Sequence, residues 1–297
     1  MTTPTVCLSF DFDAISLWIG PMGAKSPSMI SRGEFGAVAA PRILSLLERE
    51  AIPATFFVTG HTAETYPSQT RAMADAGHEI GHHGYLHENP IDLTPEAEEA
   101  VLLRGLAALD AIAGVRPVGY RSPAWDNSPH TIDLLLKHGF RYESSLMADD
   151  FSPYWCRTGD TIDPDGPYRF GRTVDLVELP VSWSLDDFPH FEYIRLPNRV
   201  SPGLSAASKV EEIWRDEFDF MMREIPDGVF TLTMHPQVIG RGHRLMMLER
   251  LIAHFKEAGA RFSTLASAAD AFRSRNSARR SGPQDGPDSR RSQTLDS

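Results

Sequence analysis

Short apolar segments alternate with longer amphipathic segments along most of the chain. The apolar segments are rich in β-branched and aromatic residues, which favour strands. We expect strands at residues 6–13, 54–60, 78–84, 118–124, 141–147, 176–183 and 229–236, and a shorter one at 261–265. Strands that alternate with helices predict a parallel sheet with the helices on its outside.

Four of the intervening segments carry helix signals at their ends. We expect helices at residues 41–51, 94–114, 128–140 and 245–259. Pro41 suits the first position of a helix, and Thr94 and Ser128 suit the N-cap position. The last three helices are expected to end at Gly114, Gly139 and Gly259.

The number of strand–helix units favours an α/β fold, a distorted (β/α) barrel of about seven parallel strands. We expect a single catalytic domain over residues 1–272, because neither a linker nor an internal repeat precedes residue 272. In such a barrel the carboxyl ends of the strands share one face, where polar residues that follow the strands meet. An open doubly wound sheet predicts a similar clustering, so the pattern locates a site better than it distinguishes the two folds.

Charge separates the end of the chain from the rest. The net charge is −11, but residues 273–297 hold six Arg and three Asp, which leaves −14 for residues 1–272. A body this acidic repels phosphate backbones, so we expect no nucleic-acid partner. The final segment has almost no apolar residues, and we expect residues 273–297 to form a disordered tail.

The sequence also bears on the expected location. No stretch is apolar enough to span a bilayer, and the first residues show neither the basic region nor the apolar core of an export signal. The two cysteines, Cys7 and Cys156, do not make a disulfide framework. We therefore expect a cytoplasmic protein without a membrane partner.

Two carboxylates end the first expected strand. Asp11 and Asp13 are separated by Phe12, so strand alternation projects both to the same side. Neighbouring carboxylates do not both ionise easily unless a cation lies beside them. A pair of solvated aspartates at a strand end is the alternative interpretation.

The third expected strand leads into a histidine-rich segment, HHGYLH, residues 82–87. On a helical turn, the four-residue spacing of His83 and His87 would place both imidazoles on one face, within reach of one metal. Catalytic zinc sites commonly have three protein ligands, so a carboxylate would complete this one. His82 would face elsewhere and is interpreted as structural. A polar loop without a metal is the alternative.

Further polar and aromatic residues are candidates for the same face. His235 ends the seventh expected strand and could act as a general acid, although such a histidine is often a core residue. Arg121 could orient a carboxylate, and Asp186 or Asp187 could orient the ring of His235. Three tryptophans could line a pocket or belong to the core: Trp125, Trp155 and Trp183.

Taken in order, five motifs resemble those of the polysaccharide deacetylase superfamily, also called the NodB-homology or carbohydrate-esterase-4 group. The motifs are SFDFD, HGYLH, RSPA, SWSLDD and LTMH, and the resemblance spans about residues 5–270. Longer segments such as DAGHEIGHHGYLHENP are similar to the branch that holds peptidoglycan deacetylase-like proteins, cyclic imide hydrolases and allantoinase-like enzymes.

The resemblance implies a role for each matching residue. Asp13, His83 and His87 would bind one divalent metal, most simply Zn²⁺. Asp11 would be the general base, held by Arg121, and His235 would be the general acid. We expect three residues to contact the substrate: Trp125, Trp183 and Asp187. The chain departs from the family motifs at three positions, Phe12, Gly84 and Ala124.

These features predict a metal-dependent hydrolase of non-peptide carbon–nitrogen bonds. Our first expectation for the substrate is a small cyclic imide or ureide. The alternative is N-deacetylation of a sugar or a peptidoglycan-type polysaccharide. Two non-enzymatic alternatives are a carbohydrate-binding module on the same scaffold and a structural protein with a histidine-rich loop. By resemblance we also expect a homo-oligomer, such as a tetramer.

Overall fold

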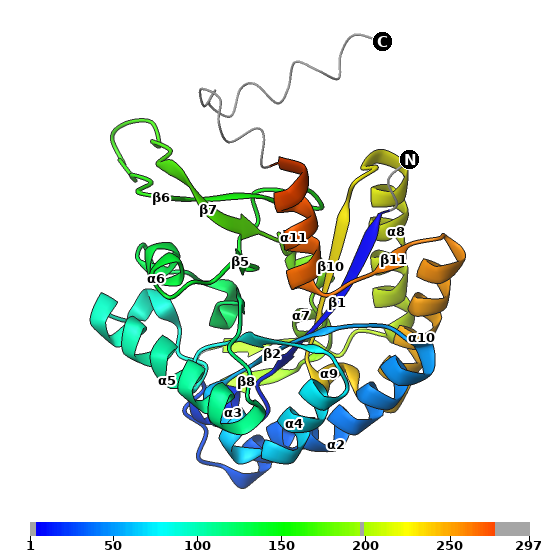
Figure 1. Ribbon diagram of the computed structural model, residues 1–297. Helices are drawn as coiled ribbons and strands as arrows, with labels where there is room; N and C mark the ends of the chain where they lie inside the picture. The colour runs from blue at the N-terminus through cyan, green and yellow to red at the C-terminus, as the bar shows by residue number, and fades with distance from the viewer. Residues whose placement is uncertain (1–3, 197–198, 277–297) are drawn as a thin grey trace.

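A computed structural model describes residues 4–196 and 199–276 (Figure 1). Its main sheet has nine strands, and its path runs in the order β10-β1-β2-β3-β4-β5-β7-β6, with β11 paired to β1. The strands of the sheet are β1 Thr5–Phe12, β2 Thr55–Val58, β3 Glu79–His82, β4 Gly119–Tyr120, β5 Tyr142–Glu143, β6 Tyr154–Thr158, β7 Arg172–Glu178, β10 Val229–Met234 and β11 Arg261–Phe262. All neighbours are parallel except β6 and β7, so the expected distorted barrel of parallel strands is confirmed.

Helices cover the outside of this curled sheet (Figure 1). The longer helices are α2 Pro27–Glu50, α4 Pro67–Asp75, α5 Pro95–Ala113, α8 Ala207–Glu224, α10 Gly242–Glu257 and α11 Leu265–Asn276. The shorter ones are α1 Ser16–Ile19, α3 Gly60–Thr65, α6 Thr131–Lys137, α7 Asp187–Phe191 and α9 Pro236–Ile239, with 3₁₀ turns at Pro90–Asp92, Pro123–Trp125 and Trp183–Leu185. A separate hairpin pairs β8 Ile194–Leu196 with β9 Arg199–Ser201. In the described part of the chain, no helix has both the length and the apolar character that crossing a membrane requires.

Strand β1 lies at the centre of the core. All eight of its residues are buried, because β10 and β2 flank it and helices cover its outward side. The Phe10 and Phe56 rings stack with their centroids 5.0 Å apart. The carboxyl end of β1, which carries Asp11, is therefore held firmly from both sides.

The other half of the sheet is joined less extensively. Strands β3 and β4 pair only at His82 and Tyr120. Strands β4 and β5 pair at two positions, Gly119 with Tyr142 and Tyr120 with Glu143. The connection between the β1–β3 side and the β4–β7 side of the barrel thus rests on few backbone hydrogen bonds.

Two expected helix starts are wrong. Pro41 lies inside α2, which begins at Pro27, because small residues such as Gly33 and Gly36 let its first half pack closely against Ala14. Helix α6 begins at Thr131, and the hydroxyl of Ser128 instead donates to the buried carboxylate of Glu98 at 2.5 Å.

Other helix ends follow the expectation. The hydroxyl of Thr94 accepts a hydrogen bond from the Ala97 N–H and caps α5, which ends before Gly114 at a φ of 64°. Helix α10 is followed by Gly259, also at positive φ. These ends are set by local capping chemistry, which short sequence signals describe well.

The expected boundary at residue 272 falls inside a helix. Helix α11 continues to Asn276, and Arg273 pairs with Asp175 at 2.5 Å and donates to the Arg141 carbonyl. Residues 277–297, which make up the rest of the expected tail, lie outside the described residues.

Candidate metal and catalytic site

A cavity of about 400 Å³ lies at the carboxyl ends of the strands. Its polar wall contains the two aspartates of the first motif, both histidines of the second, and His235. Its apolar wall includes Leu17, Met22, Phe188 and Ile194, which gave no sequence signal because they resemble ordinary core residues. The fold therefore brings residues from both ends of the chain to one pocket, as a parallel barrel should.

Asp13 and two histidines surround a space suited to a cation. The Nε2 atom of His83 lies 3.4 Å from Oδ1 of Asp13, and that of His87 lies 3.8 Å from Oδ2. Both oxygens of Asp13 are buried and have no hydrogen-bond partner among the described residues. Such an orphaned carboxylate beside two imidazoles fits a divalent ion, and two His with one Asp is a donor set that zinc accepts.

The protonation states of these ligands support this interpretation. Burial lowers the pKa of His83, and it lowers that of His87 to about 3, so both rings are neutral at pH 7 and offer a lone pair. Burial raises the pKa of Asp13 well above its usual range, and the carboxylates of Asp11 and Asp186 add to the effect. A bound cation would oppose this rise by stabilising the charged form.

The backbone fixes the directions of the ligands. The Asp13 carbonyl accepts hydrogen bonds from the N–H and the hydroxyl of Ser16 and from the hydroxyl of Thr62. The Nδ1 atom of His83 donates to the Arg121 carbonyl at 2.8 Å, which turns Nε2 toward Asp13. This second contact is typical of metal-binding histidines.

The helical turn expected for His83 and His87 is wrong. The two residues lie in a loop in which Gly84 has a φ of 73° and His87 a φ of 61°. The Glu88 carboxylate accepts hydrogen bonds from the N–H groups of Tyr85 and Leu86 and so shapes the bend. The loop brings the two rings to 5.0 Å between centroids without a helix.

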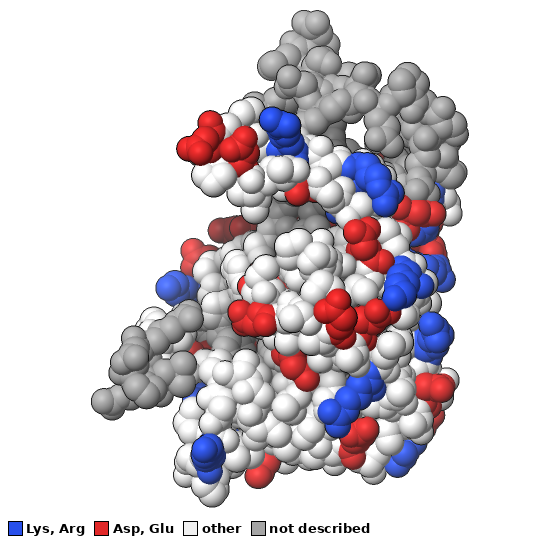
Figure 2. Space-filling model, turned by 90° about the vertical axis from the view of Figure 1, so that its left-hand side faces the viewer, with Lys and Arg blue, Asp and Glu red and all other residues white. Residues whose placement is uncertain are grey.

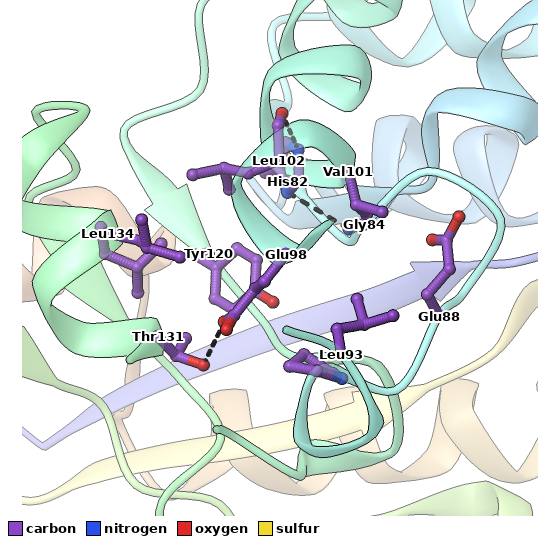
Figure 3. Close-up of a pocket in the computed structure, with 12 residues that line it drawn as sticks. His82, Gly84, Glu88, Leu93, Glu98, Val101, Leu102, Tyr120, Thr131 and Leu134 are labelled. Carbon is purple, nitrogen blue, oxygen red and sulfur yellow. Dashed lines mark hydrogen bonds between the residues drawn. The ribbon is translucent and has the colours of Figure 1, made fainter. Parts of the chain in front are cut away.

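His82 is structural, as the sequence suggested. It points away from Asp13 toward α5, where its Nε2 lies 3.0 Å from the Leu102 carbonyl, while its Nδ1 accepts from the Gly84 N–H (Figure 3). Burial lowers its pKa to about 3. The cavity beside it measures only about 10 Å³. His82 therefore anchors the start of the ligand loop to α5.

Asp11 faces the same cavity as Asp13 but has a different environment. Its Oδ1 accepts from Arg121 at 2.9 Å, while Arg121 also donates to the hydroxyl of Ser9 and to the carbonyl and hydroxyl of Ser144. Burial alone would raise the pKa of Asp11, but Arg121 and His83 outweigh it and lower the pKa. Phe12 is fully buried in the core, so its insertion between the two aspartates leaves both in the cavity.

His235 stands on the other side of Asp13. Its Nε2 lies 3.6 Å from Oδ2 of Asp13, and its Nδ1 lies 2.7 Å from Asp187 and 3.6 Å from Asp186. Burial opposes protonation of the ring, but the charges of Asp186 and Asp187 outweigh it and raise the pKa of His235 well above the usual value.

Asp187 does not lie where a substrate contact requires. It is fully buried behind His235 and accepts hydrogen bonds from both the ring and the backbone N–H of His235. The expected substrate role of Asp187 is therefore replaced by a position that orients His235. Asp186, in contrast, lines the cavity.

Two of the three candidate tryptophans line the cavity. Trp125 and Trp183 stack with ring centroids 4.3 Å apart, and Trp183 remains 47% exposed. Trp155 packs instead against Phe272 on the far side of the sheet. Ala124 and Trp125 both have positive φ, at 55° and 54°, which turns this segment into the cavity wall.

The distribution of charge on the surface is even on one face of the molecule. On the face drawn in Figure 2, acidic and basic side chains are interspersed, without a broad area of one sign.

A candidate cation site flanked by one carboxylate and one histidine, on a barrel of this kind, is typical of a metal-dependent hydrolase. The polysaccharide deacetylase family model matches residues 25–143. The chain is 42% identical over 285 residues to the peptidoglycan deacetylase of Helicobacter pylori, covering 91% of this chain and 97% of the relative. It is 33% identical over 277 residues to a peptidoglycan deacetylase-like protein of Gibberella zeae, covering 86% and 81%.

Solved structures agree with these relatives. A polysaccharide deacetylase structure from Mycobacterium smegmatis, described as putative, matches with a TM-score of 0.80 and 36% identity over 93% of this chain and 92% of that one. The structure of Puue allantoinase matches with a TM-score of 0.74 and 23% identity over 92% and 91%, which shows the shared fold alone. The chain belongs to the polysaccharide deacetylase family and is a hydrolase of carbon–nitrogen bonds other than peptide bonds.

Proposed function

We propose that this protein is a metal-dependent N-deacetylase that releases acetate from an N-acetylated sugar of the peptidoglycan type. The observation that carries the proposal is the orphaned, buried carboxylate of Asp13, which faces His83, His87 and His235 inside the cavity. The similarity of the chain to a peptidoglycan deacetylase over nearly its whole length supports the sugar substrate. The expected cyclic imide substrate has weaker support.

Asp13, His83 and His87 would hold the metal, and we propose Zn²⁺ because nitrogen and carboxylate donors suit it. When bound, the metal supplies Lewis acidity for water and for the substrate carbonyl. The chain itself holds both ligand histidines neutral and keeps their directions fixed through the Arg121 carbonyl and the bend at Glu88.

Asp11 acts as the general base in this proposal. Its pKa is lowered, so it is ionised at neutral pH and free to accept a proton from water. Arg121 holds Oδ1 and leaves the other oxygen, Oδ2, for that proton.

His235 acts as the general acid. Its raised pKa keeps the ring protonated, and the bond from Nδ1 to Asp187 directs Nε2 into the cavity. Protonation of the departing nitrogen is the step that amide hydrolysis needs most, because an unprotonated amide nitrogen is a very poor leaving group. Trp125 and Trp183 would contact the sugar ring, and the backbone of Ala124 would approach the carbonyl oxygen.

A second candidate is ring opening of a small cyclic imide or ureide. The cavity of about 400 Å³ is small, and Leu17, Met22, Phe188 and Ile194 give it apolar walls that suit a compact ring. The chain also shares its fold with an allantoinase.

The two candidates are separated by turnover. The purified protein with added zinc is assayed for acetate release from N-acetylglucosamine oligomers and for opening of succinimide and a dihydropyrimidine ring. We expect acetate release, lost in H83A, which removes one metal ligand. Turnover of the rings alone would overturn the deacetylase proposal. Turnover of neither, with zinc bound, would favour a binding module, although the base, the acid and all three ligands are present among the described residues.

Two further proposals concern the setting of the protein. The first is a cytoplasmic location, which is supported by Cys7 and Cys156. Both cysteines are buried and form no disulfide with each other, as expected in a reducing compartment. A homo-oligomer is proposed by resemblance, and sedimentation of the full chain tests it.

A further inference from the structure

Two buried carboxyl groups lie side by side behind the catalytic site. Glu143 ends β5 and Glu178 ends β7, and the two residues are direct partners in the parallel register. Both are fully buried. Within the described part of the chain, neither forms an ion pair with a basic residue.

The hydrogen bonds of this pair show how close the two groups are. The N–H of Ser145 donates to both carboxyls, at 3.1 Å to Glu143 and 3.0 Å to Glu178. The Leu146 N–H donates to Glu178 at 3.0 Å, and the hydroxyl of Ser145 donates to Glu143. Two negative charges around one N–H, without a cation, repel each other strongly in a buried site.

Among the residues that the structure describes, no charged neighbour relieves this repulsion. From β6, the Cys156 thiol donates weakly to Glu178 at 3.6 Å, and Tyr154 faces the pair with its hydroxyl already accepting from the Ala148 N–H. Tyr120 faces it from β4. Arg121 is directed to Ser144 and Asp11, and Arg157 pairs with Asp160 at the surface. Burial and Glu143 raise the pKa of Glu178 well above its usual range.

The pair is connected to the catalytic base through two serines. The hydroxyl of Ser145 accepts from the Ser122 N–H at 2.8 Å. Ser144 accepts two hydrogen bonds from Arg121, at 3.0 and 2.9 Å, and Arg121 donates to Asp11. The carbonyl of Arg121 also receives the Nδ1–H of His83. The strand end that the pair holds therefore fixes both the base and one metal ligand.

We propose that Glu143 and Glu178 share a single proton and act together as positioning residues, holding Ser144 and Ser145 so that Arg121 stays aligned with Asp11 and His83. The catalytic part of this inference rests on the proposed function. The shared proton and the alignment of His83 do not.

The first experiment measures unfolding by urea between pH 6 and pH 8. The folded pair retains a proton that the unfolded chain releases above about pH 4.3, so rising pH destabilises the wild type. In Glu178→Gln, an amide replaces the shared proton. We expect the unfolding equilibrium constant of this variant to rise less steeply with pH than that of the wild type. The two slopes should differ by up to a factor of ten per pH unit, which corresponds to one proton. Equal slopes would overturn the shared proton.

The second experiment tests positioning. Glu178→Ala leaves the N–H of Leu146 without its partner. We expect the kcat of this variant at saturating zinc to fall by about 10- to 100-fold, with KM little changed. Its affinity for zinc should weaken about tenfold. Glu178→Gln should retain both within about threefold, as a conservative replacement that keeps the acceptor. Glu79→Gln is the matched control, since Glu79 binds Tyr142 and Thr55 at the opposite end of the strands.

Each outcome decides a separate point. Wild-type kcat and zinc affinity in Glu178→Ala would overturn the positioning role, as would equal losses in Glu79→Gln. Should Glu178→Ala not fold, Ser145→Ala replaces it, because that change removes the hydroxyl between Glu143 and Ser122. If the wild type turns over no acetylated sugar, the proposed function fails. The unfolding slopes then still test the shared proton, and zinc affinity still tests the alignment of His83.

Discussion

Asp11 and Asp13 are two residues apart on one chain segment, yet their surroundings drive their pKa values in opposite directions. Arg121 contacts Asp11 and lowers its pKa, while burial without any hydrogen-bond partner raises that of Asp13. Groups with diverging environments commonly have different chemical roles. The proposed base is thus distinguished from the proposed metal ligand chiefly by Arg121, which lies 110 residues from Asp11 in the sequence.

This distinction predicts different losses in matched variants. Asp11→Asn should retain the metal and lose about 10²–10⁴-fold in kcat, because only the proton acceptor is removed. Asp13→Asn should lose the metal itself. Metal content and kcat measured on the same preparations check both. Loss of metal from both variants would contradict the assignment.

Asp187 offers a second prediction at this scale. Asp187→Asn removes a charge that raises the pKa of His235, so the ring should lose its proton at lower pH. Because a general acid must be protonated, the alkaline limb of the kcat profile should move to lower pH, and kcat at pH 8 should fall by about tenfold. The pH profile checks this, with the exposed Asp110→Asn in α5 as control. An unmoved limb would show that Asp187 does not act on His235.

At the scale of elements, hydrophobic patterning found the strands of the main sheet that carry the site, but not all of their partners. The hairpin β8–β9 and strand β6 were missed because these strands are short and pair locally, β8 with β9 and β6 with β7. Helix α8 was missed although Trp214 and Phe218 bury one of its faces. The first half of α2 was missed because Ser and Gly are poor helix formers, and packing against Ala14 overrides that preference.

The gathering of the site residues in one cavity was predicted more completely than the elements around them, while their roles stay predictions. The spacing of Asp11, Asp13 and His235 at strand ends sufficed, since a parallel barrel gathers such ends on one face. The histidine loop was placed correctly but given the wrong conformation, because a four-residue spacing describes a helix as well as a tight bend. The pair Glu143–Glu178 gave no sequence signal, since its meaning depends on the register of β5 and β7.

A helix end gives a testable consequence at this scale. Ala51 follows α2 in the left-handed region, with φ 53° and ψ 46°, where a Cβ atom is unfavourable. Ala51→Gly should therefore raise the free energy of unfolding by about 0.5–1 kcal/mol, measured by urea denaturation. Ala258→Gly is the control, because Ala258 ends α10 with φ −74° and should lose stability when replaced. Destabilisation by both changes would contradict the strain at Ala51.

At the scale of the whole molecule, the metal site joins distant parts of the chain. Asp13 follows β1 and the two histidines follow β3, so one ion would connect the ends of two strands that β2 separates in the sheet. Anything that binds only the folded state stabilises it by mass action.

We therefore expect chelation to lower Tm and added zinc to restore it. At a zinc concentration about 1,000 times Kd, the stabilisation is about 4 kcal/mol. The effect should weaken toward acidic pH, because protons compete for the ligands. Thermal unfolding with and without chelator checks this, with His83→Ala as control. A zinc response in His83→Ala equal to that of the wild type would place the ion elsewhere.

Strands β3 and β4 pair at a single position, His82 with Tyr120, so little backbone pairing joins the β1–β3 side of the barrel to the β4–β7 side. The first side carries the proposed ligands of the ion, and the second carries Arg121 and Trp125. Side-chain packing crosses this boundary instead, because Phe57 of β2 and Tyr142 of β5 belong to one core cluster. Local opening at this boundary would separate Asp11 from Arg121, so we expect the Arg121 N–H, which donates to the His82 carbonyl, to exchange faster than the amides of β1 in a hydrogen-exchange measurement.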